Sequence, residues 1–241
     1  MVVLRSSVIA LAMAVSIAAA DPVREALSSS ESRLAERAYA ALENGKPARA
    51  LEAYSEAIRR HPESYMSYYR RGVTLADQGK LEPALADLNM AVRLSPVVQT
   101  TKELGFRAWN SRLPETHTLH TVILVRSARA NILRQLKRPR DAIVDLDAAI
   151  ALDPRRTSLW QKRGLLHMEI GNMKAAIADF TALLSRRENA PWRFARGVSH
   201  FVNSDLAEAE TDFTKAMRMD PQNPLYVRWL IRTQKKRGIP I

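Results

Sequence analysis

The sequence predicts an all-α protein built from tandem helix-turn-helix repeats. Three observations lead to this prediction. Alanine and glycine recur at fixed positions with a period of 33 or 34 residues, a large apolar residue recurs four positions after one of them, and a proline closes most of the repeats. A period of this length is typical of helical repeat proteins.

Five repeats can be aligned, at residues 31–64, 65–98, 123–156, 157–189 and 190–223. Position 8 of the repeat holds Ala38, Gly72, Ala130, Gly164 and Gly197. Position 20 holds Ala50, Ala84, Ala142, Ala176 and Ala209. Position 24 holds Tyr54, Leu88, Leu146, Phe180 and Phe213. The repeats close with Pro62, Pro96, Pro154 and Pro221, and the fourth repeat has Glu188 instead.

These positions describe a helix, a turn and a second helix. Small residues at positions 8 and 20 allow two helices to approach closely, and the large residue at position 24 fills the space beside them, one helical turn further on. Gly45, Gly79 and Gly171 stand where the first helix must end, as glycine C-caps do. The closing proline cannot continue the second helix.

The fourth repeat carries the most complete motif. It reads Trp160-x-x-Arg163-Gly164-x-x-His167, followed by Ala176-x-x-x-Phe180. This pattern resembles the tetratricopeptide repeat (TPR), although that family has leucine where Arg163 stands and tyrosine where His167 stands. The resemblance covers residues 31–223 apart from one insert. It implies a right-handed α-solenoid whose first helices line a concave groove that binds a peptide or a helix of another protein.

One face of each first helix, at positions 2, 5, 9 and 12, is expected to point into this groove. The candidate groove residues are Tyr39, Tyr69, Val73, Asn131, Arg134, Gln161, Leu165, Phe194 and Phe201. They are mostly aromatic or aliphatic, which favours an apolar or amphipathic helix as the ligand. A neighbouring repeat or the insert could instead cover some of them.

Position 7 is an arginine in every repeat: Arg37, Arg71, Arg129, Arg163 and Arg196. Sixteen residues later, four of the five repeats have an aspartate: Asp87, Asp145, Asp179 and Asp212. Because a guanidinium can bind a carboxylate through two hydrogen bonds, we expect structural ion pairs Arg71–Asp87, Arg129–Asp145, Arg163–Asp179 and Arg196–Asp212. The alternative is a ladder of arginines for an anionic ligand. The first repeat has Ala53 in place of the aspartate, so Arg37 is expected to be free.

The regions outside the repeats have distinct expected roles. Residues 1–20 resemble a signal peptide, with Arg5, an apolar run and Ala18-Ala19-Ala20, so cleavage would leave Asp21 first. An uncleaved membrane anchor is the alternative. Residues 21–30 form a short lead. Residues 224–241 are expected to form a capping helix and tail, with Leu225, Trp229 and Leu230 on its apolar side.

The insert, residues 99–122, separates the second and third repeats and is expected to break their stacking. It is too long for the tight turn between repeats. It contains Trp109 and is either a surface excursion or a specialised binding element.

Composition narrows the function. The chain has no cysteine, which excludes disulfides, thiolate metal sites and a cysteine nucleophile. No phosphate-binding glycine loop or serine nucleophile motif is present, so we predict no enzyme activity, no cofactor and no metal. The formal charge of +12 favours anionic partners, and the export signal makes nucleic acid an improbable one.

Three functional hypotheses follow. The first is an exported protein-interaction scaffold, in a bacterial periplasm or secreted, that binds a peptide or helix of another protein. The second is a basic protein that binds an anionic polymer or membrane surface. The third is an accessory subunit of an envelope enzyme.

Overall fold

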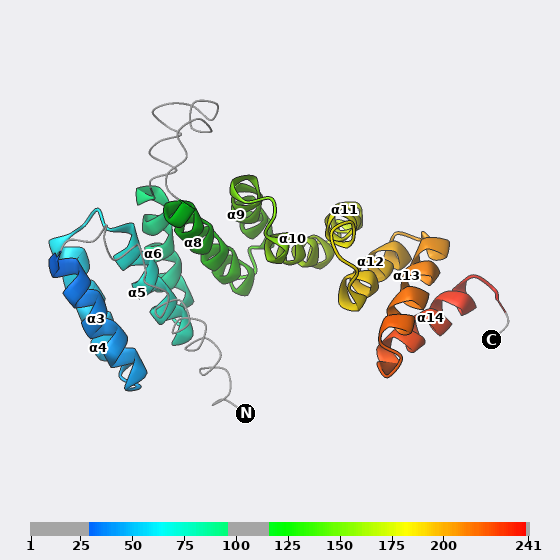
Figure 1. The fold of residues 1–241 in the computed structure, drawn as a ribbon, viewed down its shortest axis with the longest axis horizontal. Helices are drawn as coiled ribbons and strands as arrows, with labels where there is room; N and C mark the ends of the chain where they lie inside the picture. Colours follow the sequence, from blue (N-terminus) through cyan, green and yellow to red (C-terminus); the bar gives the residue numbers. More distant parts are fainter. Residues whose placement is uncertain (1–28, 96–115, 240–241) are drawn as a thin grey trace. The chain divides into compact units, whose positions relative to one another are not determined.

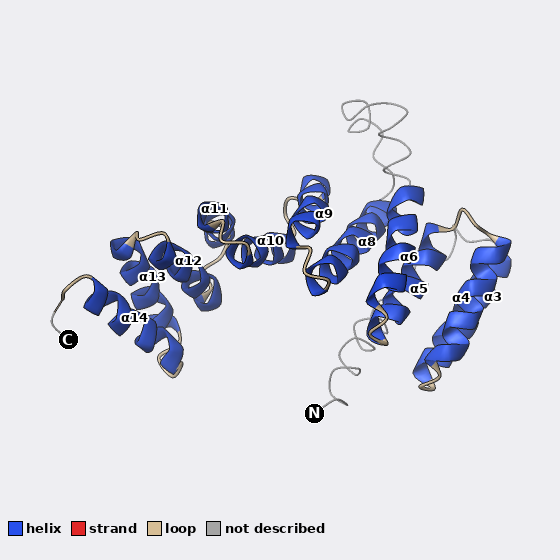
Figure 2. Cartoon of the chain, turned by 180° about the vertical axis from the view of Figure 1, so that it is seen from behind, coloured by secondary structure: helices blue, strands red, loops and turns tan. Residues whose placement is uncertain are grey.

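The computed structural model describes residues 29–95 and 116–239 (Figure 1). They belong to two compact units, the N-terminal unit up to Ile132 and the C-terminal unit from Leu133 onward, and each is described here by itself. Within the described ranges there are eleven α-helices and no strand (Figure 2). The fold is therefore the predicted all-α solenoid of helical hairpins.

Consecutive helices pair as the repeats predict. The N-terminal unit contains the hairpins α3 (Ser29–Glu43)–α4 (Pro47–Arg60) and α5 (Tyr65–Asp77)–α6 (Leu81–Leu94), followed by most of α8 (Thr116–Gln135). The C-terminal unit contains the end of α8, α9 (Pro139–Leu152), the hairpins α10 (Thr157–Glu169)–α11 (Met173–Leu184) and α12 (Ala190–Val202)–α13 (Leu206–Met219), and α14 (Pro224–Lys236).

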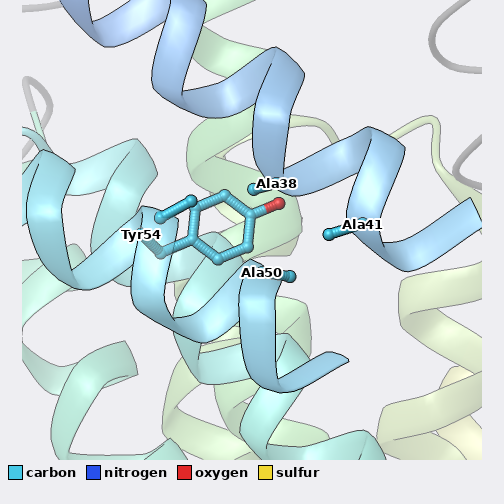
Figure 3. Close-up of a cluster of buried hydrophobic side chains, with 5 residues drawn as sticks. Ala38, Ala41, Ala50 and Tyr54 are labelled. Carbon is cyan, nitrogen blue, oxygen red and sulfur yellow. The ribbon is translucent and has the colours of Figure 1, made fainter. Parts of the chain in front are cut away.

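Each hairpin is held by the small and large residues that define the repeat. All five alanines at position 20 are fully buried, and the five large side chains at position 24 are at most 1% exposed. In the first hairpin the Tyr54 ring lies against Ala38, Ala41 and Ala50 (Figure 3). A large ring on one helix thus fits into the space left by small residues on both.

The turn inside each hairpin requires a left-handed backbone at position 15. Glycine supplies it three times, with φ of +65° at Gly45, +76° at Gly79 and +78° at Gly171. The other two hairpins have Lys137 with φ of 60° and Ser204 with φ of 71° at the same position. Residues with a Cβ are strained in this conformation, so the shared turn geometry overrides the local preference of Lys137 and Ser204.

We expect Ser204→Gly to raise the free energy of unfolding by about 0.5–1 kcal/mol, because the relief of this strain exceeds the added flexibility of the unfolded chain. The shift in the midpoint of urea denaturation measures it. Gly171→Ser is the matched reverse change and should lower the midpoint. Equal midpoints for all three proteins would contradict the strain assigned to position 15.

Helix α8 begins at Thr116, so residues 116–122 of the expected insert belong to a helix. Val125 on α8 packs against Ala91 and Val92 on α6, and Arg129 Nη1 donates to Asn89 Oδ1 at 3.0 Å. The first helix of the third repeat therefore lies beside the second hairpin, and the expectation that the insert breaks the stacking is wrong at this contact. The rest of the insert, with Trp109, and residues 1–28 lie outside the described ranges.

Helix α14 covers the last hairpin, as expected of a cap. Trp229 and the buried Leu230 pack against Phe201 and Phe213. Leu225, however, is 42% exposed, and Tyr226 is the buried residue of that turn. The predicted cap is present with Trp229 and Leu230 on its apolar side, and Tyr226 is buried there instead of the predicted Leu225.

Candidate functional site

The expected groove residues of the N-terminal unit form an aromatic surface on two adjacent first helices. Tyr39 on α3 and Tyr69 and Val73 on α5 are partly buried, and Asn131 on α8 is exposed. Tyr69 packs against the cluster of Ala91, Val92 and Val125. Burial raises the pKa of the Tyr69 phenol, and the nearby Tyr39 adds to the rise. The guanidinium carbon of Arg70, next to Tyr69 on α5, lies 5.1 Å from the centroid of the Tyr39 ring, which places Tyr39 on the side of α3 that faces α5.

Arg70, which the sequence analysis did not select, lies at the same surface. The residue is only 8% exposed, and its guanidinium carbon is 5.1 Å from the centroid of the Tyr39 ring. The Nε atom is buried and has no hydrogen-bond partner in the described part of the chain. The sequence did contain a signal for Arg70. Two consecutive arginines stand at positions 6 and 7 of the second repeat, and the ion pair with Asp87 accounts for Arg71 alone.

The expected groove residues of the C-terminal unit differ in whether their side chains already bond to other residues of the protein. Leu165 on α10 is 47% exposed. Gln161 Oε1 accepts a hydrogen bond from the indole nitrogen of Trp192 at 3.2 Å. The exposed Arg134 pairs with Glu169, with 2.7 Å between Nε and Oε2. Leu165 is thus the most exposed apolar side chain on the groove face of α10.

Phe194 and Phe201 are not groove residues, which corrects the prediction. Phe201 is only 8% exposed, and its ring centroid lies 5.3 Å from that of Trp229 on α14. The ring of Phe194 lies 5.2 Å from Tyr226 and 5.7 Å from Phe213. The capping helix covers both side chains because the last repeat has no sixth repeat to bury this face.

Three of the four expected ion pairs are present within the described hairpins. Arg71 donates to both Asp87 oxygens, at 2.8 Å from Nε and 2.7 Å from Nη2. Arg163 binds Asp179 in the same way, at 3.0 and 2.5 Å, and Arg196 binds Asp212 at 2.8 Å through both nitrogens. The fourth pair would join Arg129 of the N-terminal unit to Asp145 of the C-terminal unit and remains a prediction.

In four of the five position-7 arginines, the Nη1 nitrogen reaches back to the preceding repeat. Its acceptor is a polar side chain at position 25 in every case: Ser55 for Arg71, Asn89 for Arg129, Asp147 for Arg163 and Thr181 for Arg196. The donor–acceptor distances lie between 2.6 and 3.1 Å. Position 7 thus joins neighbouring hairpins, and these four arginines are engaged in structure, which argues against the ladder hypothesis.

Arg37 is the exception that the sequence predicted. It is exposed, and no described residue forms an ion pair with it. Together with Lys46 and Arg49 it lines an open hollow on α3 and α4 that also contains Glu52. This is a cationic surface patch at the first hairpin.

Two other kinds of site were searched for in the described ranges. No group of three or more histidine, aspartate or glutamate side chains there is placed to hold a metal ion. None of the described helices combines the length and apolar character needed to cross a bilayer.

Comparison with known proteins agrees with the hairpin geometry. The model of the tetratricopeptide repeat family matches residues 35–97, 127–191 and 162–224. The human tetratricopeptide repeat protein 13 is 24% identical over 107 residues, which cover 44% of this chain and 12% of that protein. The chain therefore spans a small part of the curated relative's length.

Solved structures show the same fold. YrrB, described as a TPR protein with an unusual peptide-binding site, superposes with a TM-score of 0.62 at 18% identity, over 79% of this chain and 87% of YrrB. MamA from Desulfovibrio magneticus RS-1 has a TM-score of 0.63 at 17% identity, over 81% and 98% of the two chains. With the matched family model spanning most of the sequence, the chain belongs to the tetratricopeptide repeat family.

Proposed function

We propose that the protein is an exported interaction scaffold that binds a peptide or helix of a partner protein on the face of its first helices. One observation supports this most directly: apolar side chains remain exposed or partly exposed at the groove positions of α3, α5 and α10. Leu165, at 47% exposure, is an example with no structural role visible in its hairpin. An exposed leucine on a first helix suits the apolar face of a bound helix.

The family provides a second, general support. Tetratricopeptide repeat proteins are generally scaffolds for protein–protein interaction, and YrrB is described as having a peptide-binding site. At 18% identity the likeness to YrrB concerns the fold alone. Peptide binding by this chain therefore rests on its own exposed groove residues.

Export is part of the same proposal and rests on the signal-like pattern of residues 1–20. Sequencing the N-terminus of the protein recovered outside the cytoplasm tests it. Asp21 is the expected first residue. A protein that retains Met1 and stays with the membrane would contradict cleavage.

The binding experiment compares two exposed apolar residues of the C-terminal unit. Peptides are selected from a displayed library against the purified chain, and the dissociation constant of the best one is measured by fluorescence anisotropy. Leu165→Glu, on the groove face of α10, should weaken binding about tenfold or more. Val144→Glu, on α9, changes a residue that is 64% exposed and should leave binding unchanged. For a peptide that seats on the N-terminal unit, Tyr69→Ala should produce the loss instead.

Two results would contradict the proposal. The first is a library that gives no binder. The second is a selected peptide whose affinity is the same for wild type, Leu165→Glu and Tyr69→Ala.

The hollow with Arg37, Lys46 and Arg49 supports a second candidate function, binding of an anionic polymer or membrane surface. Vesicles containing anionic lipid would be titrated with the protein at several salt concentrations. Affinity set by charge falls steeply with salt. The triple change of Arg37, Lys46 and Arg49 to glutamine should then abolish binding, and Leu165→Glu should not affect it.

A further inference from the structure

Arg70 differs from the arginine beside it in having no acceptor. Arg71 donates to Asp87 with two nitrogens and to Ser55 with the third. In contrast, the Nε atom of Arg70 is buried and has no acceptor among residues 29–95 and 116–239, and the residue as a whole is only 8% exposed. A buried N–H without an acceptor is costly to hold, because it has lost water and gained no hydrogen bond in return.

A tyrosine ring contacts this guanidinium. The face of Tyr39 lies over it at 5.1 Å, which provides a cation–π contact and no hydrogen-bond acceptor in the plane of the guanidinium. Burial raises the pKa of the Tyr54, Tyr65 and Tyr69 phenols, and the positive charge of Arg70 acts in the opposite direction on all three. The guanidinium therefore contacts the Tyr39 ring, and its charge also acts on phenols of α4 and α5.

The carboxylates near these tyrosines do not neutralise Arg70. Glu31, which acts on Tyr65, is buried, and its Oε1 accepts hydrogen bonds from the hydroxyls of Ser64 and Ser67. Asp77, which acts on Tyr69, is exposed and has no ion pair with Arg70 in the described residues. Within residues 29–95 and 116–239, the charge of Arg70 is thus left available to an incoming group.

The chemistry of the surface selects the ligand. A guanidinium offers two parallel N–H groups that match a carboxylate, and one cation balances one negative charge, whereas a phosphate dianion is better matched by several cations. Aromatic walls suit apolar groups next to that carboxylate. Because the guanidinium is recessed beside Tyr39, the carboxylate must be carried on a side chain that can reach it while the partner's backbone stays outside.

We propose that Arg70 is the receptor for an aspartate or glutamate side chain of the bound peptide, with Tyr39 and Tyr69 contacting the apolar residues that flank it. This inference rests on the proposed peptide-binding function and adds an acidic anchor to it. The preferred ligand is then an amphipathic segment with one acidic residue placed among apolar ones.

The test selects peptides from a random displayed library against the full chain and uses the best binder as the probe. Peptides that seat on the N-terminal unit should share an aspartate or glutamate at one position. Changing that residue to asparagine or glutamine should weaken binding to the wild type at least tenfold. The same peptide change should alter binding to Arg70→Gln less than twofold, because the partner of the carboxylate is already missing.

Two controls separate this contact from other effects. Arg49→Gln removes one charge from the exposed hollow on the same unit and should not change the affinity. Arg70→Lys keeps the charge without the two parallel N–H groups and should recover only part of the affinity. The changes in the peptide test the contact even if Arg70→Gln proves to be less stable.

Three results would overturn the assignment. They are selected peptides without a fixed acidic residue, an equal loss from the asparagine peptide in wild type and Arg70→Gln, and tighter binding of a phosphoserine than of an acidic residue at that position. If one of these results is found and the selected peptides still bind more weakly to Tyr69→Ala, the scaffold function stands and only the role of Arg70 fails.

Discussion

Gly197→Leu is expected to unfold the last hairpin and its capping helix. A Cβ atom alone at Gly197 would lie 2.8 Å from Cε1 and 3.0 Å from Cδ1 of Phe213, which is fully buried and in contact with Trp229. The ring cannot move away without displacing α14. We therefore expect a loss of about 3 kcal/mol or more in the free energy of unfolding, at or above the upper end for overpacked cores.

Thermal and urea denaturation followed by circular dichroism measure this effect. Gly164→Leu is a parallel change in the preceding hairpin, where the new Cβ would lie 3.1 Å from the Phe180 ring. Ala207→Leu adds a side chain at an exposed position of α13 and should stay within about 0.5 kcal/mol of wild type. If Gly197→Leu and Ala207→Leu have the same melting temperature, positions 8 and 24 do not pack as described.

Asp212→Ala should have an effect of similar size for an electrostatic reason. Asp212 is 1% exposed and accepts from Arg196 at 2.8 Å and from Nη1 of Arg193 at 2.9 Å. Without Asp212, the buried Arg193 keeps only Glu188 as an ion-pair partner. Arg196 loses both of its hydrogen bonds to Asp212 and keeps the one to Thr181. Breaking a buried pair by deleting one partner costs about 3–5 kcal/mol, because a charge stays buried without compensation.

Asp147→Ala is the matched control for this prediction. Asp147 also binds a position-7 arginine, with 2.6 Å between Arg163 Nη1 and Oδ1, but its side chain is 53% exposed. Arg163 keeps Asp179 when Asp147 is removed, so the cost should be about 0–1 kcal/mol. Equal destabilisation by both changes would show that burial of the aspartate is not what sets the cost.

The hairpins could be predicted from the sequence because the same packing recurs in every repeat. Ala209 and Phe213 are buried like Ala50 and Tyr54 at the equivalent positions, so five weak local signals add up to one strong pattern. The three observed ion pairs followed from the same regularity. Ser204 and Lys137 could not be assigned to left-handed turns from their own preferences, since the repeat imposes a conformation that neither residue favours.

The candidate site was harder to predict because it depends on departures from the repeat. Phe194 and Phe201 occupy groove positions, yet α14 covers them, and periodicity alone does not show what packs on a terminal repeat. Arg70 stands at position 6, which is not one of the positions that the five repeats of this chain share. Its importance comes from a missing acceptor, and only the burial and hydrogen bonds of the folded chain reveal that.

The contacts of position 7 with position 25 have a consequence for how such a chain can change in length. Every described junction of this kind uses an arginine on one hairpin and a neutral polar or acidic acceptor on the hairpin before it. Deleting residues 157–189 would bring Arg196 next to Asp147, the same chemistry that Arg163 meets now. Loss or duplication of a whole repeat therefore preserves this polar contact at the new junction.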